Sequence, residues 1–130
     1  MKYDEFIGQV RSRAGLQNRE EAVLAAQATL TVLGRRLFGG EAENLAAQLP
    51  HELQDCLQQE QSEKFDLDEF FERISEEEGV GLDEAVEHAR AVCSVLSDAV
   101  TPGEMEDVLS QLPGKFTQLF HRGGEEPSKH

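Results

Sequence analysis

The sequence has no tryptophan, one tyrosine, two cysteines and four prolines among its 130 residues, and aromatic residues make up only 6% of it. Its apolar residues are mainly leucine and alanine, which favour helices, whereas the aromatic residues that favour strands are scarce. No run approaches the roughly 18 consecutive apolar residues that a membrane-spanning helix needs. The first ten residues contain no apolar run either, so no signal peptide is expected. These absences predict an all-α, soluble protein of the cytoplasm.

Basic residues are also few. The chain has 12 Lys and Arg against 26 Asp and Glu, which gives a net charge of -14. Residues 1–60 carry six basic and nine acidic side chains (net -3), whereas residues 61–130 carry six and seventeen (net -11). An acidic surface repels phosphate backbones, so the charge disfavours nucleic acid as a partner. It leaves a basic protein partner possible, and it also keeps a protein soluble.

Two segments of the chain are nearly the same. GEAENLAAQLP at residues 40–50 recurs as GEMEDVLSQLP at residues 103–113, and DEF at residues 4–6 recurs at residues 68–70. Further matches follow in order, mostly at apolar and turn positions, which chance explains poorly. Such a period is the signature of an internal duplication.

The repetition predicts a tandem duplication of a four-helix unit. The first helical repeat is expected over residues 1–60 and the second over residues 61–122, with about eight helices packed as one bundle. A single unit of this size has a thin core, and pairing two units thickens it. Residues 123–130 are polar and rich in turn formers, so this tail is predicted to be disordered.

Helix boundaries follow from capping residues. Asn18 and Asp66 each precede a Glu by three residues, which is typical of a helix start, and Gly15 and Gly79 are expected to end helices. Prolines open the fourth helices. The expected helices span residues 3–14 and 67–78, residues 19–38 and 82–100, the repeated segments that end before Pro50 and Pro113, and residues 50–59 and 113–120. The glutamates of the repeated segments, Glu41, Glu43, Glu104 and Glu106, are expected to stabilise the first helical turn through the helix dipole.

These segments also carry a family resemblance. The opening MKYDEFIGQVRSRAGL, the following REEA and the repeated GEAENLAAQLP resemble the bacterial helical family catalogued as domain of unknown function 2267, over about residues 1–121. The resemblance implies an all-α cytoplasmic protein of two related repeats with no assigned activity, and it supplies no catalytic residues. The second repeat departs from the usual repeated segment at Met105 and at residues 108–110. The positions expected to be buried remain apolar there.

His88 is the histidine with the most suggestive surroundings. Glu84 lies one helical turn before it and Glu87 beside it. A carboxylate-bridged metal site would need Glu-x-x-His on two helices, whereas this spacing is Glu-x-x-x-His and the first repeat has Ala25 in the place of His88. We therefore expect a surface or rim histidine paired with an acid.

The two cysteines, Cys56 and Cys93, have no Cys-x-x-Cys or Cys/His spacing, so neither a zinc site nor a disulfide framework is indicated. Each stands where the other repeat has a leucine, Leu119 and Leu30 respectively. We expect both to be buried as small apolar side chains, because a reactive thiol needs an electropositive setting.

Two clusters of charged residues are the remaining candidate functional sites. The acidic run at residues 75–79, with Asp83, Glu84 and Glu87 nearby, lacks the alternating oxygen ligands of a calcium loop and is expected to be a solvated face. The basic residues Arg11, Arg13, Arg35 and Arg36 are interpreted as one cluster, which suggests contact with the acidic surface of a second copy.

The sequence therefore indicates no catalytic, cofactor-binding or metal-ligating residues, and no nucleotide loop or nucleophile elbow. The leading hypothesis is a non-catalytic module that binds a protein partner or itself as a homodimer, without nucleic acid or membrane. The alternative hypothesis is a small-molecule or lipid-type binding protein with a cavity between the repeats, lined by Phe70, Phe71, Phe116 and Phe120. An enzyme of unrecognised type ranks third.

Overall fold

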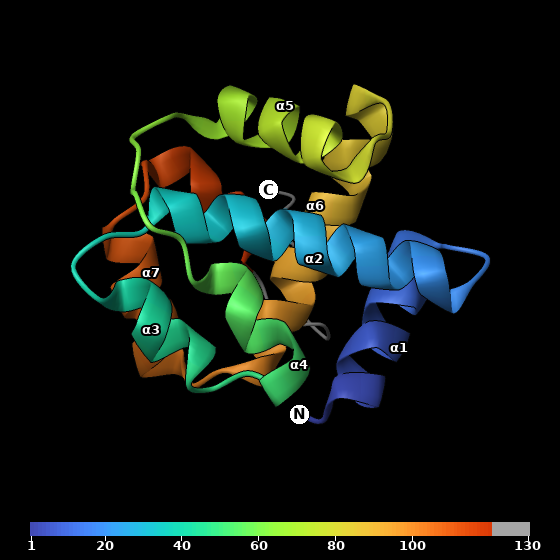
Figure 1. Ribbon diagram of the computed structural model, residues 1–130, viewed down its shortest axis with the longest axis horizontal. Helices are drawn as coiled ribbons and strands as arrows, with labels where there is room; N and C mark the ends of the chain where they lie inside the picture. The colour runs from blue at the N-terminus through green and yellow to red at the C-terminus, as the bar shows by residue number, and fades with distance from the viewer. Residues whose placement is uncertain (121–130) are drawn as a thin grey trace, which may run out of the picture.

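The computed structural model describes residues 1–120, and in this part of the chain every regular element is a helix (Figure 1). The predicted all-α class is confirmed. The predicted tail at residues 123–130 lies outside the described residues. The elements are α1 (Tyr3–Ala14), α2 (Arg19–Arg36), α3 (Glu41–Ala46), α4 (His51–Gln54), the 3₁₀ helix η1 (Asp55–Leu57), α5 (Leu67–Glu78), α6 (Leu82–Ala99), α7 (Pro102–Ser110) and the 3₁₀ helix η2 (Gly114–Leu119).

Local signals place the starts of α2 and α5 and the ends of α1 and α5, whereas α2 and α6 end at Arg36 and Ala99, before the predicted residues 38 and 100. The Asn18 side chain accepts from the Glu21 backbone N–H at 2.9 Å at the start of α2, and Asp66 caps α5 in the same way. Gly15 and Gly79 follow α1 and α5 in the left-handed conformation, which glycine adopts without a steric cost. Helices α1 and α5 each have 12 residues, and α2 and α6 each have 18.

The fourth element of each half differs from the prediction of one longer α-helix. In the first half, α4 covers four residues and continues as η1, which ends at Leu57. In the second half the segment after Pro113 is entirely 3₁₀. Gly114 and Thr117 have low helix propensity, so this segment holds its shape through the burial of Phe116 and Leu119 rather than through its own preference.

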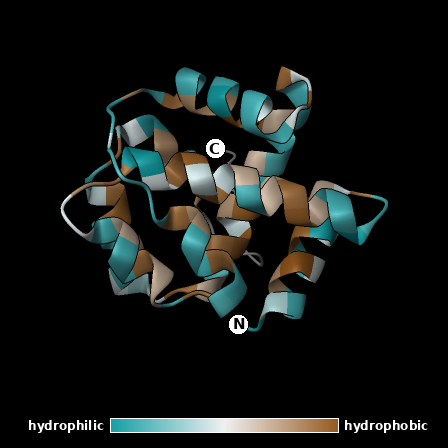
Figure 2. Cartoon of the chain, viewed as in Figure 1, coloured by the Kyte–Doolittle hydropathy of each residue, from teal (hydrophilic) through white to brown (hydrophobic). Residues whose placement is uncertain are grey.

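Helices α2 and α6 form the centre of the molecule. Helix α1 packs against both of them, and so does α5 (Figure 1). The buried apolar side chains make one continuous core that joins the two halves, and its largest fully buried members include Phe6, Phe70 and Phe116. Hydrophilic residues cover much of the outward side of α5 (Figure 2).

The repeated phrase makes the same contact twice, in opposite directions. Gln48 Oε1 accepts from the Thr101 backbone N–H at 2.8 Å, and Gln111 Oε1 accepts from the Phe38 backbone N–H at 2.9 Å. Positions 48 and 111 correspond in the sequence match, as do positions 38 and 101. Each half thus uses its glutamine to bind the backbone that follows the long helix of the other half.

Candidate functional site

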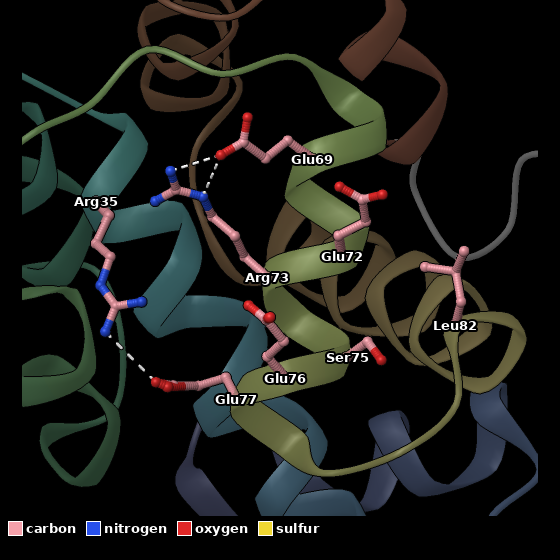
Figure 3. A pocket seen from close by; sticks show the side chains of 8 residues that line it. All are labelled: Arg35, Glu69, Glu72, Arg73, Ser75, Glu76, Glu77 and Leu82. Atoms are coloured by element: carbon pink, nitrogen blue, oxygen red, sulfur yellow. Dashed lines mark hydrogen bonds and ion pairs between the residues drawn. The ribbon is translucent and has the colours of Figure 1, made fainter.

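A cavity of about 770 Å³ lies over the outward face of α5 (Figure 3). Its wall comes mainly from α5, with one residue from the end of α2 and one from the start of α6. The lining residues are Arg35, Glu69, Glu72, Arg73, Ser75, Glu76, Glu77 and Leu82. We call this the α5 groove.

The position of α5 is fixed by its opposite face. Phe70 and Ile74 are fully buried and Phe71 nearly so, which directs the residues between them outward. Because the helix repeats every 3.6 residues, Glu72 and Glu76 lie one turn apart on the exposed side. The groove is therefore built on a rigid helix, not on a loop.

The two arginines of the α5 groove are already engaged. Arg73 donates to Glu69 Oε2 at 2.6 Å and to Glu63 Oε2 at 2.9 Å, and these hydrogen bonds raise the pKa of its guanidinium. Arg35 donates to Glu77 Oε1 at 3.4 Å. The hydrogen bond from Arg73 to Glu63 also lowers the pKa of the Glu63 carboxyl. The positive charges of the groove are thus matched by carboxylates of the chain itself.

Two carboxylates of the groove remain uncompensated. Glu72 and Glu76 are exposed, and neither side-chain carboxylate has a hydrogen bond or ion pair with any residue among 1–120. Leu82, at the edge of the groove, is 49% exposed. The lining contains neither histidine nor cysteine. The arrangement offers negative charge beside an apolar side chain, which suits binding of a cationic, partly apolar group.

The family model described as an uncharacterized conserved protein (DUF2267) matches residues 3–119. The chain belongs to this family. No curated protein matches the sequence. Within residues 1–120, none of the helices of this family member combines the length and hydropathy needed to span a membrane.

His88 does not lie where the sequence predicted. It pairs with an acid, as expected, but it is only 6% exposed, and its Nδ1 lies 2.6 Å from Glu78 Oε2, not beside Glu84 or Glu87. The surface interpretation is wrong because α1, α2 and α5 all pack against α6 and cover most of its faces. Burial raises the pKa of the Glu78 carboxyl, although the neighbouring His88 opposes this shift.

The cysteines of this DUF2267 member are both free. Cys93 is fully buried, which confirms the prediction, whereas Cys56 is only half-buried at the edge of the core. The prediction for Cys56 is wrong in this respect because it lies in the short η1 helix near the surface. Burial raises the pKa of both thiols, which makes them weaker nucleophiles at neutral pH.

The acidic run is solvated only in part. Glu76 and Glu77 are exposed, as predicted, but the side chain of Glu78 is buried against His88. Gly79 turns the chain directly after Glu78, and α6 then folds back over that side chain. One residue of the predicted solvated face is therefore part of the interior.

The predicted basic cluster does not form. Arg11 and Arg13 lie at the end of α1, near the start of α2, whereas Arg35 and Arg36 lie at the other end of α2. Since 16 residues of helix rise about 25 Å, the two pairs are far apart. Arg13 binds Asp98, and Arg36 donates to the Phe65 carbonyl at 2.9 Å.

The phenylalanines that were expected to line a ligand cavity pack in the core. The rings of Phe70 and Phe116 meet edge to face with centroids 5.2 Å apart, and Phe70 and Phe71 lie 5.9 Å apart. Phe71 and Phe120 are each nearly buried. All four rings belong to the second half and are part of the hydrophobic core.

Glu41 and Glu104 lie in the first turns of their helices, as predicted, but both are buried. Glu41 of α3 and Glu104 of α7 are each only 8% exposed. They are equivalent positions of the repeated phrase, and α3 packs against α7. This equivalence is the signal that sequence reasoning missed, because corresponding residues of two similar segments can meet face to face.

Proposed function

We propose that this chain is a non-catalytic helical module that binds a basic segment of a partner protein along the α5 groove. The observation that carries the proposal is the pair of uncompensated carboxylates, Glu72 and Glu76, next to the exposed Leu82. An amphipathic segment with Lys or Arg at helical spacing and one apolar anchor complements this arrangement.

The distribution of charge supports a basic partner. Residues 61–130, which supply α5, carry a net charge of -11. Arg35 and Arg73 are held by Glu77, Glu69 and Glu63, so they do not oppose an incoming cation strongly. Exposed charges of one sign raise the rate of encounter with an oppositely charged partner, and this effect weakens with salt.

The placement of the reactive side chains supports a non-catalytic role. His88 is buried in a pair with Glu78, and Cys93 lies in the core with a raised thiol pKa. A general base or nucleophile needs access to substrate. Neither residue lines the α5 groove.

We further propose that the two halves descend from one duplicated unit, because matched residues make matched contacts in the two directions. The proposal includes a cytoplasmic setting in a bacterium, which the family resemblance implies and which suits two unpaired cysteines. A second copy of the chain is a less favoured partner, because it brings further negative charge to the α5 groove.

The test is a titration of the full chain with a synthetic peptide of about 18 residues, five helical turns, rich in Lys and Leu on opposite faces. Isothermal titration calorimetry at low and physiological salt is expected to give binding that weakens with salt. The variant E72Q/E76Q should weaken binding several-fold, because each rim charge contributes modestly.

The matched control is E20Q/E43Q, which removes two exposed glutamates outside the groove and changes the net charge equally. It should bind the peptide as the unmodified chain does. Equal loss in both variants would show only general electrostatic attraction and would overturn the proposal, as would no binding at low salt. Sedimentation at two protein concentrations identifies self-association; a concentration-dependent dimer that E72Q/E76Q dissolves would make a second copy the occupant.

A further inference from the structure

Three carboxylates meet between α3 and α7. Glu41 and Glu104 face each other from the first turns of these helices, and Asp107 lies one turn further along α7. One oxygen atom of each lies within 4.8 Å of the others. This spacing allows all three oxygens to contact a single ion.

The two glutamates are buried without full hydrogen bonding. Each is 8% exposed, and Oε2 of each has no hydrogen-bond partner among residues 1–120. A buried carboxylate oxygen without a partner is costly, and such groups in native proteins are usually paired or bound to a metal. Among the described residues, no lysine or arginine forms an ion pair with either glutamate.

The like charges also oppose each other. Two buried carboxylates at such close range need a positive charge between them, which is either a shared proton or a cation. The third carboxylate, Asp107, is exposed, which gives an ion a route from solvent and leaves room for water ligands.

We propose that Glu41, Glu104 and Asp107 bind a divalent cation that joins α3 of the first half to α7 of the second. The ligand set contains only carboxylate oxygens, which favours a hard cation such as Mg²⁺, Mn²⁺ or Ca²⁺ over a metal that prefers nitrogen or sulfur. Three negative charges suit a divalent rather than a monovalent ion. The ion binds at the contact between the two repeated phrases and stabilises it.

This site is distinct from the α5 groove, since no residue is shared between them. The groove proposal therefore stands or fails independently of the cation. The helices α3 and α7 are short, with six and nine residues. An ion between them is expected to rigidify this end of the molecule most.

The test uses the full chain after treatment with a chelator, titrated with MnCl₂ and followed by the paramagnetic signal of free Mn²⁺. One ion per chain is expected, with a rise in Tm that EDTA reverses, and competition by Ca²⁺ or Mg²⁺. The variant E41Q/E104Q should weaken binding at least about ten-fold, since the loss of even an outer partner of a metal ligand costs that much.

The matched control is E43Q/E106Q, which replaces the two exposed glutamates of the same helices and changes the net charge by the same amount. It should bind Mn²⁺ as the unmodified chain does. If E41Q/E104Q does not fold, the variant D107N tests the proposal instead. The Asp107 side chain is exposed and not needed for the core, and removal of its carboxylate should still weaken Mn²⁺ binding. Equal affinity in D107N or E41Q/E104Q, or no binding of any of the three ions at millimolar concentration, would overturn the proposal.

Discussion

Arg13 Nη2 donates to Asp98 Oδ2 at 2.6 Å, and this ion pair joins α1 of the first half to α6 of the second. The equivalent positions in the sequence match are Glu77 and Arg35, which also form an ion pair between the halves. In both pairs the first half supplies the arginine and the second half the acid. Two copies of the first half would place arginine against arginine, so the charges favour pairing of unlike halves.

Reversal of the Arg13 charge tests this pairing. R13D places like charges at the contact with Asp98 and should lower the free energy of unfolding by about 1 kcal/mol, since the pair is only partly exposed. The swap R13D/D98R should recover part of that loss. Urea unfolding of the two single variants and the double variant gives the coupling free energy. Strict additivity would show that the pair does not couple the halves.

Gly34 allows a close approach between α2 and the backbone of η1. A Cβ at this position would lie 2.7 Å from the Leu57 carbonyl oxygen and 2.9 Å from Leu57 Cα. Backbone atoms cannot move aside as a side chain does, so G34A should lower the free energy of unfolding by about 1–3 kcal/mol. Chemical denaturation measures this loss.

The control for that variant is G8A. Gly8 lies within α1 with no atom near its Cβ position, and alanine there should stabilise the protein by about 0.5–1 kcal/mol. A stabilising effect of both substitutions would show that the contact at Leu57 relaxes without cost.

The free energy of unfolding should depend on pH because of the buried carboxyl of Glu78. Its carboxyl pKa lies above the ordinary value of 4.5, mainly because of burial, while His88 opposes the shift and Glu84 and Glu21 add to it. As the pH rises past 4.5, the unfolded chain loses this proton first and the folded chain keeps it. The contribution of Glu78 to the free energy of unfolding should therefore fall with rising pH until the folded carboxyl has also ionised.

The variant E78Q keeps the neutral form at every pH and should remove this decline. Urea unfolding at several pH values from 4.5 upward gives the slopes. The exposed Glu76 supplies the control, because E76Q should leave the slope unchanged. A slope that is the same in the unmodified chain and E78Q would contradict the assignment.

The two thiols should differ in reactivity. Cys56 is half-buried and should react slowly with a thiol reagent in the native protein, whereas Cys93 should react only after unfolding. Counting labelled thiols by mass spectrometry under native and denaturing conditions checks this. C93S should leave the native labelling rate unchanged, and rapid native labelling of two thiols would contradict the burial of Cys93.

Helix positions were predictable because their signals are local. Asn18 and Asp66 cap the helices that follow them, as expected, and Thr101 caps α7, which begins at Pro102. These groups act on backbone atoms within three residues, so the residues next to a helix start are enough to predict it. The fourth elements were less predictable, because Gly114 and its neighbours have little helical preference and depend on the core.

The candidate site was predictable only in its composition. The excess of acid in the second half is evident from the sequence, but the α5 groove requires Leu82 of α6 and Arg35 of α2 to lie beside α5. The same limit explains the error at His88, whose partner Glu78 is ten residues earlier and on another helix.

The sequence by itself determined the all-α class, the starts of the long helices and the equivalence of positions 41 and 104, because capping and repetition are properties of neighbouring or matched letters. Only the tertiary structure decided that these two carboxylates share the interior and that Glu72 and Glu76 stay without partners. Such facts depend on which helix faces cover each other, and that is set by the packing of the whole core.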